Sequence, residues 1–425
     1  MADIQTAKGV RDIPPVEKAL KNKVVNVLTS VFELYGFRPL ETPILERYET
    51  LSAKFAAGEV SDALKETFRL TDQGERALGL RFDLTVPLAR YVAMNPTLKM
   101  PFKRYELGQV FRDGPVRLGR YREFWQCDVD TIGSTSMLAD AEVLAVVSRV
   151  FSKLGLDVVV KVSNRRVLNG ILVEAGVTDC ERAIIAIDKL DKIGVSGVSK
   201  ELSERGFSAK QIEGIFKFVK EGVSLKELQK GVKNAEAVEG LKELEELFLY
   251  LNSMGVTNVL FDVSLARGLA YYTGTVYEAV LRNGVFRGSL AGGGRWDNMI
   301  GNFMGSKLQV PAVGVAFGLE PIMDVLKMEQ KVLGESVVQV YVLPIGVVQE
   351  GLMIVEQLRA KGIPAEVCLG KKGVSKNLDY ASALGVPYVV MVGEDELKQK
   401  KVKLRDMKTG TEQLLTVNEV VKKLK

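Results

Sequence analysis

Apolar residues recur at helical spacing near the start of the chain and alternate with polar residues further along. Residues 16–35 carry apolar side chains three and four positions apart, after a Pro-Pro pair and before Gly36, which predicts an amphipathic helix. The next segment, FRPLETPILE, has an extended character, and its two prolines indicate the edge of a sheet. Residues 102–132 alternate on both sides of the short loop DGPVRLG, as in an antiparallel hairpin.

The pattern of apolar and polar residues changes twice in the middle of the chain. Residues 140–154 predict a helix and residues 157–163 a strand, and residues 166–252 then show short helical patterns rich in Lys and Glu. Strand patterns return at 258–266 and 275–282. We expect AGGGRWD to form a glycine-rich loop before the apolar run VPAVGVAFGLEPIMDVL. A small helical module therefore interrupts a strand-rich region.

The last fifth alternates strand, helix, strand, helix and strand, and then predicts a hairpin turning near KTGT and a short final helix. Alternation of this kind indicates a small α/β domain with a largely parallel sheet. The expected organisation is a first domain built from residues 1–165 and 253–330, a helical insertion over 166–252, and an α/β domain over 337–425.

Composition places the chain among ordinary globular proteins. It has 425 residues, of which 47% are hydrophobic and 26% charged, enough for two or three domains. No segment has the length and apolarity of a membrane span, and the start lacks the apolar core of a signal peptide. Cys127, Cys180 and Cys368 are widely separated, which favours thiols in a reducing compartment over disulfides or a zinc site. A cytoplasmic location is expected.

Charge is concentrated at one end of the chain. The net charge is +5, and residues 337–425 hold 14 Lys and Arg against 10 Asp and Glu, a difference of +4. Such an excess is consistent with a solvated surface and equally with a footprint for a phosphate backbone.

The chain contains no histidine. Ser-His-Asp hydrolysis, His-ligated zinc hydrolysis and phosphohistidine transfer are therefore excluded. Reactions that need no general base, such as attack by an already ionised carboxylate, remain open. The segment RGLAYYTG at 267–274 places an arginine and two adjacent tyrosines between glycines, which neither a strand core nor a surface loop requires.

Five segments, in order, resemble the motifs of one family. FELYGFRPLETPILE resembles motif 1 of class II aminoacyl-tRNA synthetases, with Pro43 as its proline, and residues 102–130 resemble motif 2. PAVGVAFGLEPI lies where motif 3 belongs, and LARGLAYYTGTVYE and AGGGRWD resemble two peptides of histidyl-tRNA synthetases. The resemblance implies an α+β class II catalytic domain, an antiparallel sheet flanked by helices, with a small helical insertion and a C-terminal α/β anticodon-binding domain.

The resemblance also implies an activity. The chain is expected to be a histidine–tRNA ligase, which activates histidine with ATP to histidyl-adenylate and transfers the histidyl group to the 3′ end of histidine tRNA. Mg²⁺ is expected with ATP, with ligands that the sequence does not identify. The expected partners are histidine, ATP, the acceptor end and anticodon of the tRNA, and a second copy of the chain joined through motif 1.

The expected reaction, adenylate formation, requires positively charged side chains. Adenylate formation brings a carboxylate to the anionic α-phosphate of ATP, so the developing charge must be stabilised and no proton need be moved. By resemblance, Arg112 contacts the α-phosphate and Arg267 bridges the substrate carboxylate and that phosphate, as a bidentate guanidinium can. These two arginines are the predicted catalytic residues. A surface position for Arg112 and a structural ion pair for Arg267 are the alternatives.

The remaining site residues follow from the same motifs. A neutral imidazole offers one donor and one acceptor, so polar side chains should select it. Asp130 is expected to accept from one ring nitrogen and Tyr272 to contact the other, with Tyr271 beside it chiefly in packing. The predicted histidine site comprises Asp83, Thr85, Gln126, Asp130, Arg267, Tyr271 and Tyr272, and the predicted ATP site comprises Arg112, Arg120, Gly293 and Gly294.

Three positions depart from the family pattern. Motif 3 commonly ends in an arginine that helps to hold ATP, where this chain has Pro321. Motif 2 often has an acidic residue at the position of Gly114, and many relatives have aspartate at the position of Ala270. The first departure suggests that another cation substitutes or that nucleotide binding is altered.

Two other functions remain open. A synthetase-like regulatory subunit of a phosphoribosyltransferase would bind histidine without making the adenylate, and Pro321 favours that idea. The intact RGLAYYTG and the anticodon-type domain speak against it, because such paralogues tend to lose both. A tRNA-independent adenylating ligase would leave the C-terminal domain without a role.

Overall fold

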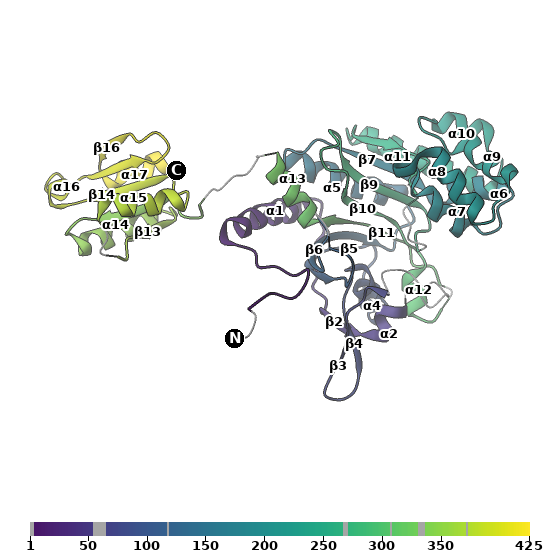
Figure 1. Ribbon diagram of the computed structural model, residues 1–425, viewed down its shortest axis with the longest axis horizontal. Helices are drawn as coiled ribbons and strands as arrows, with labels where there is room; N and C mark the ends of the chain where they lie inside the picture. The colour runs from purple at the N-terminus through teal and green to yellow at the C-terminus, as the bar shows by residue number, and fades with distance from the viewer. Residues whose placement is uncertain are drawn as a thin grey trace. The chain divides into compact units, whose positions relative to one another are not determined.

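The computed structural model describes residues 4–53, 65–116, 119–266, 271–306, 308–329, 336–370 and 373–425. The chain folds as two compact units, residues 1–12 with 24–326 and residues 13–23 with 327–425, each considered by itself below. Figure 1 shows the elements of both units.

An eight-stranded sheet organises the larger unit, in the order β1-β5-β6-β11-β10-β9-β7-β8. Its inner neighbours are antiparallel, whereas β1 pairs parallel with β5 and β8 pairs parallel with β7 at the two edges. The predicted hairpin over 102–132 is confirmed, because β5 and β6 pair along their whole lengths. The prolines of FRPLETPILE also predicted the edge correctly. The strands are β1 (Arg38–Pro39), β5 (Phe102–Phe111), β6 (Glu123–Ile132), β7 (Val158–Asn164), β8 (Val259–Phe261), β9 (Thr275–Leu281), β10 (Ser289–Arg295) and β11 (Ala312–Gly318).

The predicted glycine-rich loop is wrong, because AGGGR lies in β10 between β9 and β11. A Cβ on Gly293 would overlap the carbonyl oxygen of Gly314 on β11, so the glycines allow two backbones to approach closely rather than turn. The strand predicted at 258–266 ends early at Phe261. It stops there because Asp262 accepts hydrogen bonds from the amide and hydroxyl of Ser264 at 3.0 and 2.6 Å, which forms a turn.

Two helices cover one face of this sheet. They are α1 (Pro15–Leu34) and α5 (Met137–Lys153), close to the predicted ranges. The rings of Phe32 on α1 and Phe151 on α5 lie 5.6 and 5.8 Å from the ring of Phe317 on β11. Side chains that share the face of Phe317 are therefore covered by helices, and the opposite face of β11 carries the cavity described below.

Residues 165–253 are helical, as the sequence predicted. The helices are α6 (Arg165–Glu174), α7 (Cys180–Ile187), α8 (Leu190–Glu204), α9 (Ala209–Phe218), α10 (Leu225–Gly231) and α11 (Ala235–Ser253). Ser208 and Ser224 begin α9 and α10 with capping boxes, which satisfy amide groups at the helix starts. Helix α11 packs against α6 and α5, so this region rests on the main sheet (Figure 1). The three-domain division stays a prediction.

Shorter elements complete the larger unit. A three-stranded sheet of order β2-β4-β3 follows α1 in the chain, and neither its β3 nor its β4 was predicted. These elements are β2 (Leu45–Arg47), α2 (Tyr48–Ala53), β3 (Arg69–Thr71), β4 (Ala77–Leu80), α4 (Thr85–Met94), α12 (Met299–Phe303) and α13 (Leu319–Met328).

The C-terminal unit holds a second sheet of order β13-β12-β14-β15-β16. The first three strands in this order are parallel and the last two antiparallel, as the strand–helix alternation and the KTGT hairpin predicted. Its elements are β12 (Val340–Pro344), α14 (Val348–Ala360), β13 (Ala365–Val367), α15 (Val374–Ala383), β14 (Tyr388–Val392), α16 (Glu394–Lys398), β15 (Val402–Asp406), β16 (Glu412–Leu415) and α17 (Val417–Leu424).

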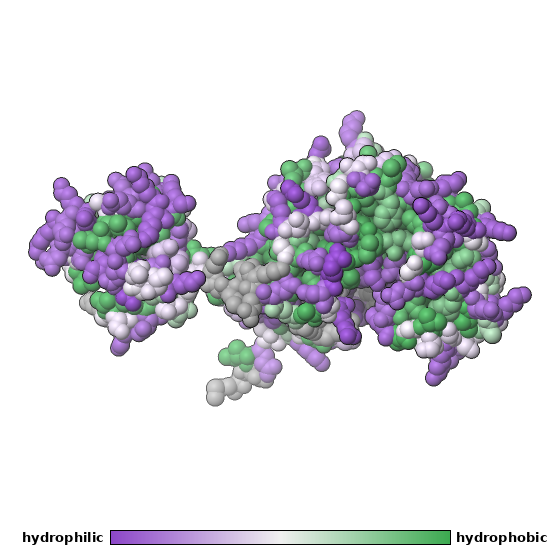
Figure 2. All heavy atoms as spheres, turned by 90° about the horizontal axis from the view of Figure 1, so that it is seen from above, coloured by the Kyte–Doolittle hydropathy of each residue, from purple (hydrophilic) through white to green (hydrophobic). Residues whose placement is uncertain are grey.

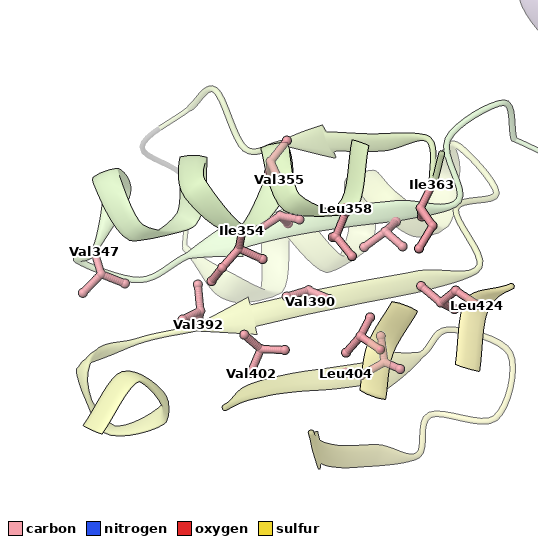
Figure 3. Close-up of a cluster of buried hydrophobic side chains, with 13 residues drawn as sticks. Val347, Ile354, Val355, Leu358, Ile363, Val390, Val392, Val402, Leu404 and Leu424 are labelled. Carbon is pink, nitrogen blue, oxygen red and sulfur yellow. The ribbon is translucent and has the colours of Figure 1, made fainter. Parts of the chain in front are cut away.

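Two apolar clusters stabilise this unit, and Figure 3 shows the larger of them. Ile354 and Leu358 of α14 face Val390 of β14 and Leu404 of β15, and Leu424 of α17 closes the cluster (Figure 3). Burying these side chains stabilises the unit by about 25 cal/mol per Å² of apolar surface removed from water. Hydrophilic side chains dominate the face of the unit visible in Figure 2.

None of the helices in the described ranges is both long and apolar enough to cross a bilayer. The three cysteines form no disulfide bond, and Cys127 is buried in the sheet.

Candidate active site

A cavity of about 170 Å³ opens on the face of the main sheet opposite α1 and α5. Strands β6, β10 and β11 form its floor, and the segments that precede α4 and β9 contribute its walls. Its lining consists of Phe82, Asp83, Thr85, Arg112, Gln126, Asp128, Asp130, Tyr271, Tyr272, Gly292, Gly293, Gly294, Trp296, Gly314, Val315 and Ala316.

Strand alternation explains which side chains of β6 reach the cavity. Cys127 pairs in register with Phe317 and so shares the face beneath the helices. Gln126, Asp128 and Asp130, two residues apart, lie on the other face and line the cavity. The sequence of β6 thus puts an amide and two carboxylates in a row on one side of a strand whose other side carries Cys127 and Val129.

A buried arginine faces these carboxylates from β5. Arg104 is fully buried and pairs in register with Asp130, and its guanidinium lies 2.8 Å from Asp130 Oδ2 and 3.6 Å from Glu106 Oε2. Burial nevertheless raises the pKa of Asp130 to about 6, with Arg104 opposing and Glu106 adding to the rise. The floor of the cavity is therefore acidic and only partly neutralised.

The N-terminus of α4 supplies two further polar groups. Asp83 Oδ1 accepts a hydrogen bond of 2.9 Å from the amide of Val86, and Thr85 is the first residue of the helix. Both side chains line the cavity. A carboxylate fixed in this way can receive a substrate ammonium group.

The two tyrosines of RGLAYYTG stack beside the cavity. Their ring centroids are 4.5 Å apart, and the Tyr271 hydroxyl donates to the Tyr272 hydroxyl at 3.3 Å. A Cβ on Gly294 would lie 2.9 Å from the ring of Tyr272, so this glycine makes room for the ring. Tyr272 also packs with Leu265 and Val276, and Tyr271 is partly buried against the same cluster.

Arg112 connects the cavity to a larger groove of about 1200 Å³, because it lines both. It follows β5 directly, its Nε donates to the carbonyl oxygen of Phe82 at 3.0 Å, and its guanidinium lies 5.0 Å from the centroid of the Phe124 ring. Burial lowers the pKa of Arg112, and the carboxylate of Asp83 opposes that change. The groove is also lined by Arg120, Arg287 and Pro321.

Glu66 stands where motif 2 lacks its acidic side chain. A Cβ on Gly114 would lie 2.7 Å from Cδ of Glu66, so the Glu66 carboxylate fills the space that a side chain at 114 would take. Glu66 lines the groove, and its carbonyl oxygen accepts a hydrogen bond of 2.7 Å from the amide of Asp113.

The structure brings most of the predicted site residues together. Those that line the cavity are Asp83, Thr85, Arg112, Gln126, Asp130, Tyr271, Tyr272, Gly293 and Gly294. Arg120 lines the groove instead, whereas the two glycines predicted for ATP line the cavity. Arg267, like Gly268 and Ala270, lies outside the described residues.

Sequence reasoning missed Asp128, Trp296 and the counter-ion Arg104. Asp128 could have been found from its spacing, because it lies midway between Gln126 and Asp130, two predicted histidine-binding residues on a strand whose side chains alternate between faces. Arg104 could have been found from the hairpin register, which places it opposite Asp130. The described part of the chain contains no cluster of three or more Asp, Glu or Cys side chains suited to a metal ion.

An antiparallel sheet floor, a long hairpin with an arginine directly after its first strand, and a strand–helix pair formed by β11 and α13 together define the catalytic domain of a class II aminoacyl-tRNA synthetase. Comparison with known proteins agrees with this class. The family model of histidyl-tRNA synthetase matches residues 9–322, and that of the anticodon-binding domain matches residues 339–425.

Individual relatives match over the same length. Histidine–tRNA ligase 1 of Bacillus cereus is 41% identical over 418 residues, which is 97% of each chain. The crystal structure of histidyl-tRNA synthetase from Nostoc sp. PCC 7120 superposes with a TM-score of 0.88 at 31% identity, covering 100% of this chain and 99% of that one. The chain belongs to the histidyl-tRNA synthetase family, and the predicted fold class is confirmed.

A further structure shares the fold alone. It is described as an ATP phosphoribosyltransferase regulatory subunit/histidyl-tRNA synthetase from Bacillus halodurans C, with a TM-score of 0.76, 22% identity and coverage of 92% of this chain and 98% of that one.

Proposed function

We propose that this chain is a histidine–tRNA ligase that forms histidyl-adenylate from histidine and ATP and then charges histidine tRNA. One observation supports it above all others: a small acidic cavity with two tyrosines meets a larger groove at Arg112. Histidine would occupy the cavity and ATP the groove. The substrate carboxylate and the α-phosphate would then meet at Arg112.

The first step needs positioning and charge stabilisation. Asp83 and Thr85 would hold the ammonium group of histidine, which directs its carboxylate toward Arg112. A carboxylate oxygen attacks the α-phosphorus, the bond to the bridging oxygen breaks, and pyrophosphate leaves with the electron pair. The guanidinium of Arg112 stabilises the negative charge that develops on the phosphorane oxygens. By resemblance, Arg267 bridges the same two groups.

The second step transfers the histidyl group. A ribose hydroxyl of the terminal tRNA adenosine attacks the carbonyl carbon, an ester bond forms, and AMP leaves. Without histidine in the chain, no imidazole of the protein can remove the hydroxyl proton. We infer that the leaving phosphate takes it, because its oxygens would lie next to the attacking group.

Mg²⁺ enters this proposal as the ion that ATP carries on its phosphates. Carboxylates that line the groove, such as Glu66 and Glu278, fit a hard cation and are the candidates to hold it. The C-terminal unit would bind the anticodon, which is consistent with the family model that it matches and with its excess of four positive charges. A protein of translation is expected in the cytoplasm.

Arg287 is the cation that we propose in place of the motif 3 arginine. It lines the same groove as Pro321 and is exposed there, next to Phe286. We expect Arg287→Gln to raise the KM for ATP about tenfold, the equivalent of one charge-assisted contact, and to leave the KM for histidine unchanged. Steady-state pyrophosphate exchange at varied ATP measures both. Arg282→Gln is the control, because Arg282 pairs with Asp157 at 3.1 Å outside the groove. An unchanged ATP KM in Arg287→Gln would show that the nucleotide tail is held otherwise.

A homodimer through motif 1 is proposed from the small sheet. Leu45 on β2 and Leu70 on β3 are 48% and 43% exposed, and both share a face with Leu78 and Leu80 of β4. Exposed leucines gathered on one face indicate a surface that another protein covers. We expect Leu45→Glu to convert a dimer to a monomer in light scattering after size exclusion, and Leu260→Glu on β8 to leave the mass unchanged. A wild-type monomer would contradict the proposal.

Histidine-dependent exchange of pyrophosphate into ATP, followed by charging of tRNA, tests the ligase. The regulatory alternative has one observation in its favour, Pro321 in the nucleotide groove. It predicts histidine binding without any exchange. Exchange with histidine and charging of tRNA would exclude it, and binding alone would exclude the ligase.

A further inference from the structure

The family resemblance assigns ring recognition to Asp130, yet the structure surrounds that carboxylate with protein groups. Arg104 lies 2.8 Å from its Oδ2, and the Trp296 side chain hydrogen-bonds to it. Its Oδ1 lies against Gly314, where a Cβ would overlap it. Asp130 therefore has an ion pair and a ring hydrogen bond before any ligand arrives, although its Oδ2 makes no hydrogen bond with the described residues.

Asp128 has no ion pair of this kind with the described residues. It lies two residues away on the same face of β6, lines the same cavity and is 2% exposed. Its Oδ1 is buried and has no hydrogen-bond partner among the described residues. Leaving a buried acceptor unpaired costs about 1–3 kcal/mol, so such a group in a cavity indicates that a ligand supplies the missing donor.

We propose that Asp128 is a second ring-recognising carboxylate of the histidine pocket and pairs directly with one imidazole nitrogen. Asp130, which Arg104 and Trp296 hold in place, is the first such carboxylate, as the family resemblance implies. This inference rests on the proposed function in that histidine is taken as the ligand, and it names the specificity-determining residue of that same site.

The protonation of Asp128 gives the contact its selectivity. Burial raises the pKa of Asp128 well above its ordinary value, Asp130, Asp83 and Glu106 raise it further, and Arg104 opposes them. In the proposed pocket, Asp128 carries its proton before histidine binds. When neutral histidine binds, the O–H bond of Asp128 breaks and an N–H bond forms on the ring, which leaves an imidazolium beside a carboxylate. No proton is taken from or lost to water. A ligand that cannot accept the proton does not form this imidazolium–carboxylate ion pair and should bind more weakly.

Asp128→Asn keeps the shape of the side chain and removes the transferable proton. We expect the dissociation constant for histidine, measured by calorimetry on the full chain without ATP, to rise at least tenfold. In the wild type, affinity should fall as pH rises past the folded-state pKa of Asp128, because the shared proton must then come from water. That alkaline fall should be absent in Asp128→Asn.

Thr131→Val is the matched control. Thr131 is also on β6, is 3% exposed and has a hydroxyl without a hydrogen-bond partner among the described residues, but it lies on the other face and does not line the cavity. Its histidine affinity and pH profile should equal those of the wild type. A purely structural role for Asp128 predicts that both variants behave like the wild type, and that result would overturn the proposal.

A second measurement needs no variant. Histidine fluorinated at ring carbon 2 is nearly isosteric with histidine and is a far weaker base. The wild-type chain should bind it at least tenfold more weakly than histidine, and equal affinities would overturn the proposal. Neither binding assay requires catalysis. Wild-type protein that binds histidine without pyrophosphate exchange would therefore refute the ligase while the assignment of Asp128 stands or falls separately.

Discussion

Replacing Arg112 by glutamine is expected to lower kcat for histidine-dependent pyrophosphate exchange by about 10²–10³-fold, the usual effect of removing one donor that stabilises transition-state charge. Arg112 is the residue that lines both the cavity and the groove, so its guanidinium would lie where the two substrates meet. The carboxamide keeps some hydrogen bonding and loses the charge. The KM for histidine should change less than kcat, because the stabilised charge develops only in the transition state.

Exchange kinetics at saturating ATP measure this effect. Arg149→Gln, at an exposed position on α5 outside the cavity and the groove, should retain wild-type exchange. If Arg112→Gln retained more than about a tenth of wild-type kcat, the loss would be smaller than removal of such a donor causes. That result would show that Arg112 does not contact the reacting phosphate.

Replacing Arg104 by methionine is expected to lower the free energy of unfolding by about 3–5 kcal/mol at pH 8, as breaking a buried ion pair does. Arg104 is fully buried and is the cation beside Asp128 and Asp130. Its removal leaves these two buried carboxylates without their counter-charge, whereas Glu106 keeps its ion pair with Arg81 at 2.9 Å. Urea unfolding followed by circular dichroism measures the loss.

The same variant should be less destabilised at pH 5. Asp130 has a pKa raised to about 6 even beside Arg104, and an aspartate of the unfolded chain titrates near 3.9. Between these values the folded state binds more protons than the unfolded state, so the contribution of Asp130 to stability falls as pH rises. Loss of Arg104 raises the folded pKa further and widens that window. Arg76→Met, which breaks an exposed pair with Asp72, should cost less than about 1 kcal/mol at either pH. An equal loss at pH 5 and pH 8 in Arg104→Met would contradict this account.

The sequence predicted the elements whose patterns are set by burial. The β5–β6 hairpin alternates because one face packs beneath helices and the other faces a cavity, and the C-terminal unit alternates because each helix covers a parallel strand. Strand β10 was missed because its glycines carry no side chain to show a period. Strands β3 and β4 of the small sheet were missed because they have only three and four residues.

The candidate site was predictable where single residues act alone and less so where they act through neighbours. Motif positions named Asp83, Asp130 and Tyr272, and the structure places all three at one cavity. The partners of those residues come from tertiary contacts that no local pattern reports. Glu66 fills the space beside Gly114 from a segment almost fifty positions earlier in the chain. Arg287, between β9 and β10, lines the same groove as Pro321.

Residues on the two faces of β6 are under different constraints. Cys127 and Val129 lie on the face beneath the helices, whereas Gln126, Asp128 and Asp130 line the cavity and would be constrained by a molecule bound there. Because neighbours in sequence point to opposite sides, a mutation can alter the ligand preference without disturbing the interior beneath it. A lineage can therefore inherit the scaffold intact and diverge in what it recognises. On this strand, the alternation of side chains between the two faces is what allows ligand preference to change without loss of the fold.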